Sequence, residues 1–231
     1  VYNALFKHMN LPWQYATLPL TSGERIYDIM EELSMGGAAI TMPLKGAVRT
    51  SRAAADRWVE ETGAANTIAR TGSGFTLYNT DAMAFSELFD MAPGARVLIY
   101  GTGETAKSAF AAAKETKREV HVTGRHLPAD PLLAAHYTAD PLPCDLFINT
   151  TPRGYMDQDI SWDHLIPQEV SGVMDLVMGA EESTLVAWAN ARNLSVTDGF
   201  TFWCHQGAIQ TSLLTGYAVT PQMLQAIGGA Q

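Results

Sequence analysis

A strand that runs directly into a glycine turn and a helix is the feature that most constrains the fold of this chain. Residues 96–100 read Arg-Val-Leu-Ile-Tyr, Gly101, Thr102 and Gly103 follow, and an alanine-rich stretch continues to Thr116. This arrangement places a pyrophosphate against the free N–H groups of a helix N-terminus. It predicts a Rossmann-type parallel sheet that binds a dinucleotide.

One acidic residue stands beside this turn. Glu104 follows Gly103, then come Thr105 and Ala106, with alanine as the small residue that replaces a third glycine. A carboxylate in the first turn stabilises a helix, but it would repel a phosphate bound there. On the second interpretation, replacing Glu104 by glycine is expected to tighten cofactor binding.

The end of the next expected strand bears on which cofactor binds. Residues 119–123 form this strand, and Gly124 and Arg125 follow it. A site that selects NAD normally carries an acid about 20 residues after the glycine turn, at the end of the second strand. Neither residue is acidic, and a planar guanidinium suits a 2′-phosphate, so NADP is expected rather than NAD. The alternative is a solvent-exposed surface arginine.

Strand and helix patterns alternate along the rest of the chain, which predicts the α/β class with two units. Pro93-Gly94 separates the two units. The expected strands are 13–20, 38–42, 66–70, 75–79, 96–100, 119–123, 145–149, 172–177 and 194–197. The expected helices are 1–9, 22–33, 51–61, one after Asp81, one running to Thr116, 182–191, 202–214 and 221–227.

Composition excludes several classes of function. The chain has 231 residues, is 47% hydrophobic and carries a formal charge of −9, which disfavours nucleic acids and anionic membranes as partners. No apolar run is long enough to span a bilayer, and the spacing of metal ligands is absent. Two isolated cysteines, Cys144 and Cys204, indicate a reducing compartment, so we expect a cytoplasmic protein with a small-molecule partner and no metal.

Polar residues gather at the ends of expected strands in the first half of the chain. Thr41 and Lys45 follow one strand, Asn66 begins another, and Asn79-Thr80-Asp81 ends a third. Each could be a helix cap, a turn former or a surface side chain. Because ligands of α/β proteins bind at the carboxyl edge of the sheet, together they indicate a site.

Five motifs in order resemble those of the shikimate dehydrogenases, which reduce 3-dehydroshikimate to shikimate in aromatic amino acid biosynthesis. The motifs are Gly37 with Ile40-Thr41-Met42-Pro43-Leu44-Lys45, Gly63-Ala64-Ala65-Asn66-Thr67, Asn79-Thr80-Asp81, Asn149-Thr150-Thr151-Pro152 with Gly154, and Asp198-Gly199 with Gln206-Gly207-Ala208. The resemblance covers nearly the whole chain. It implies an NADP-dependent oxidoreductase.

The resemblance also implies domains and residue roles. A substrate-binding catalytic domain would comprise 1–88 and 205–231, and a Rossmann domain 89–204, with the two facing across a cleft. Lys45 and Asp81 would be the catalytic pair. The substrate's hydroxyls would contact Thr41, Asn66 and Gln206, and the cofactor would contact Gly101, Thr102, Gly103, Thr105, Gly124, Arg125, Leu176 and Gly199. A homodimer is one assembly left open.

Departures from the family pattern leave alternatives for the substrate. The family's two serines that grip the substrate carboxylate are missing, so either the chain is truncated or that site is lost. Tyr2-Asn3 stands in place of a His-Asn pair, and Met178 in place of a tyrosine. An NAD-dependent quinate or shikimate dehydrogenase and a catalytically weak ligand-sensing relative are the alternatives.

Overall fold

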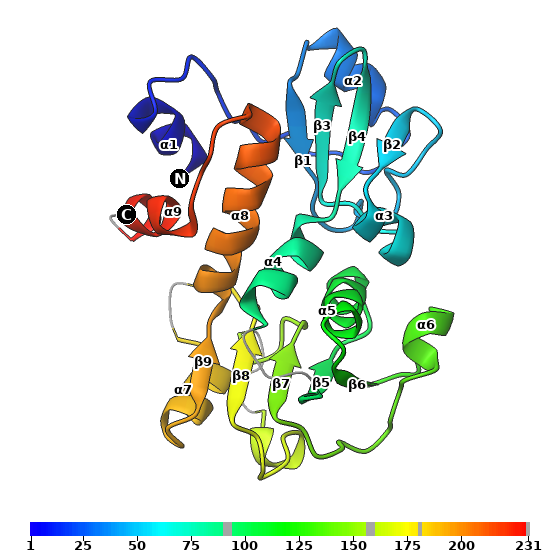
Figure 1. Cartoon of the computed structure of the whole chain (residues 1–231), viewed down its shortest axis with the longest axis vertical. Coiled ribbons are helices and arrows are strands. Elements are labelled where there is room, and N and C mark those ends of the chain that lie inside the picture. The colour runs from blue at the N-terminus through cyan, green and yellow to red at the C-terminus, as the bar shows by residue number, and fades with distance from the viewer. Residues whose placement is uncertain (90–93, 156–159, 180–181, 230–231) are drawn as a thin grey trace. The chain divides into compact units, whose positions relative to one another are not determined.

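The computed structural model describes residues 1–89, 94–155, 160–179 and 182–229 (Figure 1). The described chain divides into two compact units, residues 1–80 with 204–231 and residues 81–203. The two boundaries lie within helices α4 (Thr80–Leu88) and α8 (Gly199–Thr215). Pro93, half of the expected Pro-Gly boundary, lies outside the described residues.

The first unit contains a four-stranded mixed sheet in the order β1-β3-β4-β2. The strands are β1 (Gly37–Ala39), β2 (Ala53–Ala55), β3 (Thr67–Thr71) and β4 (Gly74–Tyr78). Strands β3 and β4, both expected, form an antiparallel hairpin, with Gly72 at a φ of 59° in its tight turn. The helices are α1 (Tyr2–His8), α2 (Ile26–Glu32), α3 (Arg57–Thr62) and α9 (Pro221–Gly228).

Apolar side chains of this sheet and of two helices form the core of the first unit. It contains Ile26 and Met30 of α2, Val59 of α3, and Ile68 and Leu77 of the hairpin. The helical spacing of Ile26, Ile29, Met30 and Leu33 predicted α2 correctly, although the helix begins at Ile26 rather than near Ser22.

Two expectations for the first unit were wrong, and a third was correct only in part. The expected strand 13–20 has no regular secondary structure. The side chain of Asn3 forms hydrogen bonds with the backbone N–H and carbonyl of Tyr15, so these groups do not pair with another strand, and Pro19 has no N–H to donate. The expected helix 51–61 is instead strand β2 followed by α3, which Asp56 caps through a 2.7 Å hydrogen bond from the Val59 N–H. The expected buried strand 38–42 is short and half-buried.

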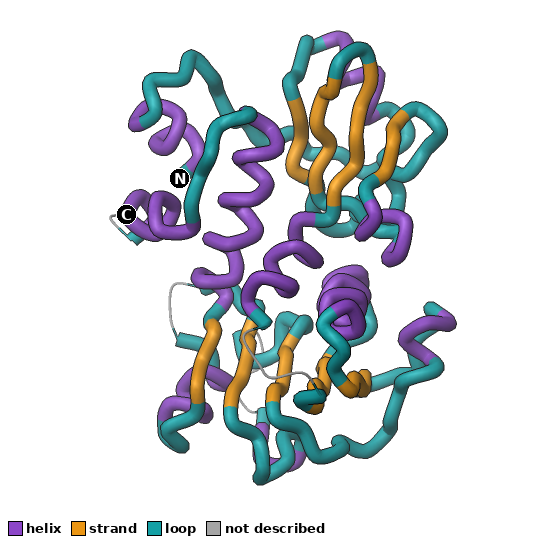
Figure 2. Tube along the Cα trace, in the orientation of Figure 1, coloured by secondary structure: helices purple, strands orange, loops and turns teal. Residues whose placement is uncertain are grey.

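The second unit contains a five-stranded, fully parallel sheet in the order β6-β5-β7-β8-β9. Strands are orange and helices purple in Figure 2. Its strands are β5 (Arg96–Tyr100), β6 (Glu119–Thr123), β7 (Leu146–Asn149), β8 (Gly172–Asp175) and β9 (Ser195–Thr197). All five were expected, with small differences at their ends. The order reverses between β5 and β7, the kind of position where doubly wound sheets bind their ligands.

Helices α5 (Glu104–Glu115), α6 (Pro131–Ala134) and α7 (Thr184–Asn190) and a 3₁₀ turn (Trp162–His164) complete the unit. Helix α5 packs against β5 and β6, and its buried residues are mostly alanine, which lets the helix approach the sheet closely. The core contains Leu98, Phe147 and Val173 of the sheet and Trp162 and Leu185 outside it. Helix α6 and the 3₁₀ turn were not expected.

Candidate functional site

The glycine turn after β5 has a backbone that requires glycine. Gly101 has a φ of 129°, and its N–H donates to the carbonyl of Thr123 at 2.9 Å. A Cβ at Gly101 would lie 2.2 Å from the Thr150 hydroxyl oxygen. Gly103 then precedes α5, whose first N–H groups have no partner within the helix. This turn can therefore hold the backbone close to a phosphate.

A cavity of about 360 Å³ lies at the carboxyl ends of β5, β6 and β7. It is the cavity expected where the strand order reverses. Its lining residues are Tyr100, Gly101, Thr102, Gly124, Arg125, His126, Thr151, Pro152 and Arg153. Two arginines and a histidine are among them, and no carboxylate is, so the cavity suits an anion.

Four of the expected cofactor residues, Gly101, Thr102, Gly124 and Arg125, line this cavity. The other four lie elsewhere in the same unit. Gly103 and Thr105 are at the start of α5, Leu176 follows β8, and Gly199 begins α8, where a Cβ would lie 2.2 Å from the carbonyl oxygen of Val177. Their contacts with a cofactor stay a prediction.

Sequence reasoning missed His126, Thr151, Pro152 and Arg153 as cavity residues. His126 directly follows Arg125. The other three belong to the Asn149–Gly154 motif, which resembles a motif of the family but for which no cofactor contact was predicted. The parallel sheet itself was the signal, because the residues after β7 must lie beside those after β5.

The turn after β7 is held by the buried side chain of Asn149. Its amide nitrogen donates to the carbonyl of Arg153 at 3.0 Å and to Asp175 at 2.8 Å, and its oxygen accepts from the Thr151 N–H at 3.0 Å and hydroxyl at 2.7 Å. Asp175 also accepts from Ser183 and from the Val177 N–H. Burial raises the pKa of Asp175, although these donors oppose the effect.

Glu104 does not line the cavity. Its carboxylate lies 3.0 Å from the ammonium of Lys107, which lies 3.2 Å from Asp130. Burial opposes the charged lysine, but the two carboxylates outweigh it and raise the pKa of Lys107. Lys107 is shared between two carboxylates, so it offsets part of the Glu104 charge that was expected to repel a phosphate.

Asn66 is the centre of a polar cluster in the first unit. Its side-chain oxygen accepts from the N–H and hydroxyl of Thr80 at 2.9 and 3.0 Å, and its amide donates to Gln206 at 3.3 Å. Gln210 donates to the hydroxyl of Thr67 at 2.8 Å and to the carbonyl of Asn66 at 3.2 Å. Two of the expected substrate residues, Asn66 and Gln206, are thus in direct contact.

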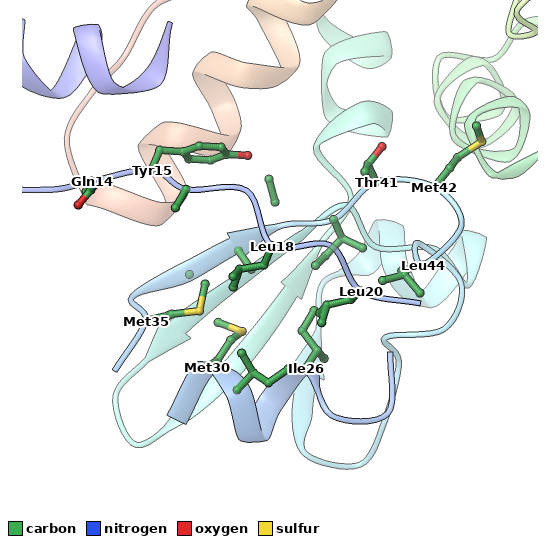
Figure 3. A pocket seen from close by; sticks show the side chains of 16 residues that line it. Gln14, Tyr15, Leu18, Leu20, Ile26, Met30, Met35, Thr41, Met42 and Leu44 are labelled. Carbon is green, nitrogen blue, oxygen red and sulfur yellow. The ribbon is translucent and has the colours of Figure 1, made fainter. Parts of the chain in front are cut away.

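Lys45 and Thr41 lie on the turn after β1. The carbonyl of Lys45 accepts from the Ala65 N–H at 2.9 Å, which ties its backbone to the segment that leads to Asn66. Thr41 lines a separate cavity of about 210 Å³ whose walls are mainly aliphatic and methionine side chains (Figure 3). Lys45, Asn66 and Gln206 do not line this cavity, so its apolar part is not the expected hydroxyl-binding site.

Asp81 is the second residue of α4 and belongs to the second unit, whereas Lys45 belongs to the first. The Asp81 side chain is buried, which is unusual for an acid that only caps a helix. Its partnership with Lys45 stays a prediction.

Tyr2 is a polar residue of the first unit that sequence reasoning gave no role. Its ring stacks on Tyr15 with centroids 4.7 Å apart, and its hydroxyl lies 3.5 Å from the side-chain oxygen of Gln210. Burial and the neighbouring Tyr15 raise the pKa of Tyr2, although a hydrogen bond with Gln206 opposes them. The one sequence feature that could have drawn attention to Tyr2 is that it stands where the family has a histidine.

None of the helices in the described ranges combines the length and apolar content needed to cross a bilayer. The same ranges contain no group of three or more His, Cys, Asp or Glu side chains placed to hold a metal ion. Both cysteines are buried free thiols.

Comparisons with known proteins identify relatives along the whole chain. Residues 1–68 match the family model described as the shikimate dehydrogenase substrate binding domain. The shikimate dehydrogenase (NADP(+)) of Magnetococcus marinus is 26% identical over 97% of this chain and 88% of its own length. That of Anaeromyxobacter sp. (strain Fw109-5) is 28% identical over 96% of this chain and 87% of its own length.

The fold also matches solved structures. Shikimate 5-dehydrogenase of Thermus thermophilus, solved in complex with NADP(H) and shikimate, superposes with a TM-score of 0.83 over 99% of this chain and 92% of that one, at 23% identity. This likeness concerns the fold, and it includes both the mixed sheet and the parallel sheet. The family model over residues 1–68 and relatives aligned over nearly the whole chain show that this protein is similar to shikimate dehydrogenases, and the structural match shows that it shares their fold.

Proposed function

We propose that this protein is an NADP-dependent shikimate dehydrogenase, which interconverts 3-dehydroshikimate and shikimate. The observation that carries the proposal is the cationic cavity where the strand order of the parallel sheet reverses. Arg125 lines it at the end of β6, where an NAD-selecting site would carry an acid. The relatives' names, shikimate dehydrogenase (NADP(+)), agree with this assignment.

The residues present fit a dinucleotide phosphate. A Cβ at Gly101 would fill the turn, since it would lie 2.2 Å from Thr150, and a Cβ at Gly124 would lie 3.3 Å from Thr102. The absence of side chains at these two glycines lets the backbone pack closely against Thr150 and Thr102 beside the cavity, and Arg125 can donate two parallel hydrogen bonds to a phosphate bound there. When bound, NADPH supplies a hydride to the substrate carbonyl.

In this proposal the residues of the first unit bind the substrate and move a proton. The carbonyl oxygen becomes negative as it is reduced, so the ammonium of Lys45 would stabilise that charge and donate the proton. Asp81 would hold the ammonium in position. Thr41, Asn66 and Gln206 would bind the ring hydroxyls, which suits the amide and hydroxyl groups of the Asn66 cluster.

The test is a spectrophotometric assay of NADP and NAD reduction with shikimate and with quinate. We expect turnover with shikimate and NADP. Turnover with quinate and NAD alone would favour the quinate enzyme. Binding of shikimate without any turnover would favour a ligand-sensing protein and refute the proposal.

Location and assembly belong to the proposal too. Two buried free thiols agree with a reducing, cytoplasmic location. We propose a homodimer as the assembly, which sedimentation equilibrium would test directly.

A further inference from the structure

We infer that Arg153 is a second specificity-determining residue, which binds the 2′-phosphate of NADP from the side of the cavity opposite to Arg125. The inference rests on the proposed function, since it concerns the same cofactor. It starts from the arrangement of the cavity: Arg125 follows β6, Arg153 follows β7, and β5 lies between these two strands in the sheet. The loop after β6 and the loop after β7 therefore form two sides of the cavity, and each carries one arginine.

The topology assigns the cavity to the adenosine half of the cofactor. The pyrophosphate position is at the start of α5, where Gly101–Gly103 lead into the helix. The end of the second strand of such a sheet reads the adenosine ribose, and Gly124 and Arg125 occupy that place. Arg153 lines the same cavity as these two residues. It is thus placed near the ribose and its 2′ substituent.

The backbone of Arg153 is fixed rather than loose. Its carbonyl accepts from Asn149 at 3.0 Å, and its N–H donates to the Thr151 hydroxyl at 3.2 Å. The next residue, Gly154, has a φ of 88°, and a Cβ there would lie 3.0 Å from the Thr184 hydroxyl oxygen and 3.1 Å from the Trp162 ring. These constraints fix the backbone position from which the Arg153 side chain extends.

Charge explains why a second arginine belongs there. A phosphate monoester carries about −1.5 to −2 charges at neutral pH, which one guanidinium does not neutralise. Among the described residues that line the cavity there is no Asp or Glu. The chain as a whole carries −9, so two arginines and a histidine in one cavity make a local exception that favours an anion.

Arg153→Gln tests the inference through binding alone. Adenosine 2′,5′-bisphosphate carries the 2′-phosphate, and 5′-AMP lacks it, so isothermal titration calorimetry with both compounds isolates that group without any turnover. We expect the variant to bind the bisphosphate about tenfold more weakly or worse, and 5′-AMP within about twofold of the unchanged protein. Arg153→Lys should be intermediate, because it keeps the charge and loses the paired donors.

Arg192→Gln is the matched control. Arg192 lies in the same unit, pairs with Asp163 at 2.7 Å and does not line the cavity, so its loss changes net charge equally without touching the site. Equal weakening of both compounds by Arg153→Gln would mean that Arg153 contacts a group that they share, the base, the ribose or the 5′-phosphate, and this would overturn the inference. Unchanged binding of the bisphosphate would overturn it too.

The two proposals can fail separately. Tight bisphosphate binding that depends on Arg153, in a protein without dehydrogenase activity, would refute the proposed function and support the inference. If the Arg153→Gln variant keeps dehydrogenase activity and still prefers NADP to NAD, the proposed function is supported and the inference about Arg153 is refuted.

Discussion

The amide of Asn149 donates a 2.8 Å hydrogen bond to the carboxylate of Asp175, and neither side chain is exposed to solvent. The bond joins the carboxyl ends of neighbouring strands β7 and β8. Asn149 also holds the Arg153 turn, and Asp175 receives the N–H of Val177, so one pair of side chains sets two loops at the edge of the sheet.

Asp175→Asn is expected to destabilise the protein by about 1–3 kcal/mol. An asparagine offers one acceptor oxygen in place of two, which leaves the donor of Asn149 or of Ser183 buried without a partner. Urea denaturation followed by circular dichroism measures the change. Asp163→Asn, at an exposed surface ion pair, is the control and should cost less than about 1 kcal/mol.

Glu104 and Lys107 should affect NADP affinity in opposite directions. Glu104→Gln removes a charge that Lys107 already offsets in part, so we expect the Kd for NADP to tighten by less than about threefold. Lys107→Gln leaves Glu104 and Asp130 uncompensated near the start of α5 and should weaken binding several-fold. Fluorescence titration of both variants measures the two constants. A weaker Kd for Glu104→Gln would contradict this view of the pair.

The ion pair of Arg96 and Asp145 should make stability depend on acid pH. Hydrogen bonds from the Arg96 side chain and N–H lower the pKa of Asp145 below its ordinary value of 3.8. A carboxyl whose pKa is lower in the folded state stabilises the fold above its unfolded pKa, and this contribution is lost as the pH falls through the folded pKa. The Asp145 side chain is one-third exposed, so the contribution is small.

The measurement is the free energy of unfolding of the unchanged protein and of Asp145→Asn across the acid range. We expect the difference between them to be present near neutral pH and to shrink as the pH falls below 3.8. A difference that grew towards acid pH would have the wrong sign for this pair.

Lys45→Met is expected to lower kcat with shikimate by about 10²–10⁴-fold, because a general acid contributes a factor of that size. The Kd for NADP should stay unchanged, since Lys45 does not line the adenosine cavity. Lys114→Met, which removes an exposed lysine of α5, controls for the loss of charge. Retention of most of kcat by Lys45→Met would remove Lys45 from the mechanism.

Sequence patterns predicted the second unit better than the first for a physical reason. Its strands are buried in a parallel sheet, so each is a short apolar run between turn residues, as at Arg96–Tyr100. In the first unit, β2 is a three-residue alanine strand with no such signal, and it is defined only by pairing with Phe75–Leu77 of β4. Local patterns do not encode such tertiary pairing.

The site residues show the same division. Gly101 and Arg125 could be found from local order along the chain, since the glycine turn and the second strand end are separated by a fixed distance. Arg153 and Tyr2 could not, because each meets its neighbours only in the folded chain: Arg153 across the sheet from Arg125, and Tyr2 beside Gln210 more than two hundred residues away.

Gly101→Ala should abolish NADP binding more completely than any single charge change. The new Cβ would lie 2.2 Å from the Thr150 hydroxyl oxygen, and a φ of 129° is strained for any residue with a side chain. The turn must therefore shift, which moves the backbone N–H groups that face the phosphate. Gly36→Ala is the control, because nothing lies within 4 Å of its Cβ and its φ is not positive. Calorimetry with NADP measures both variants, and an unchanged Kd for Gly101→Ala would mean that the turn does not approach the cofactor.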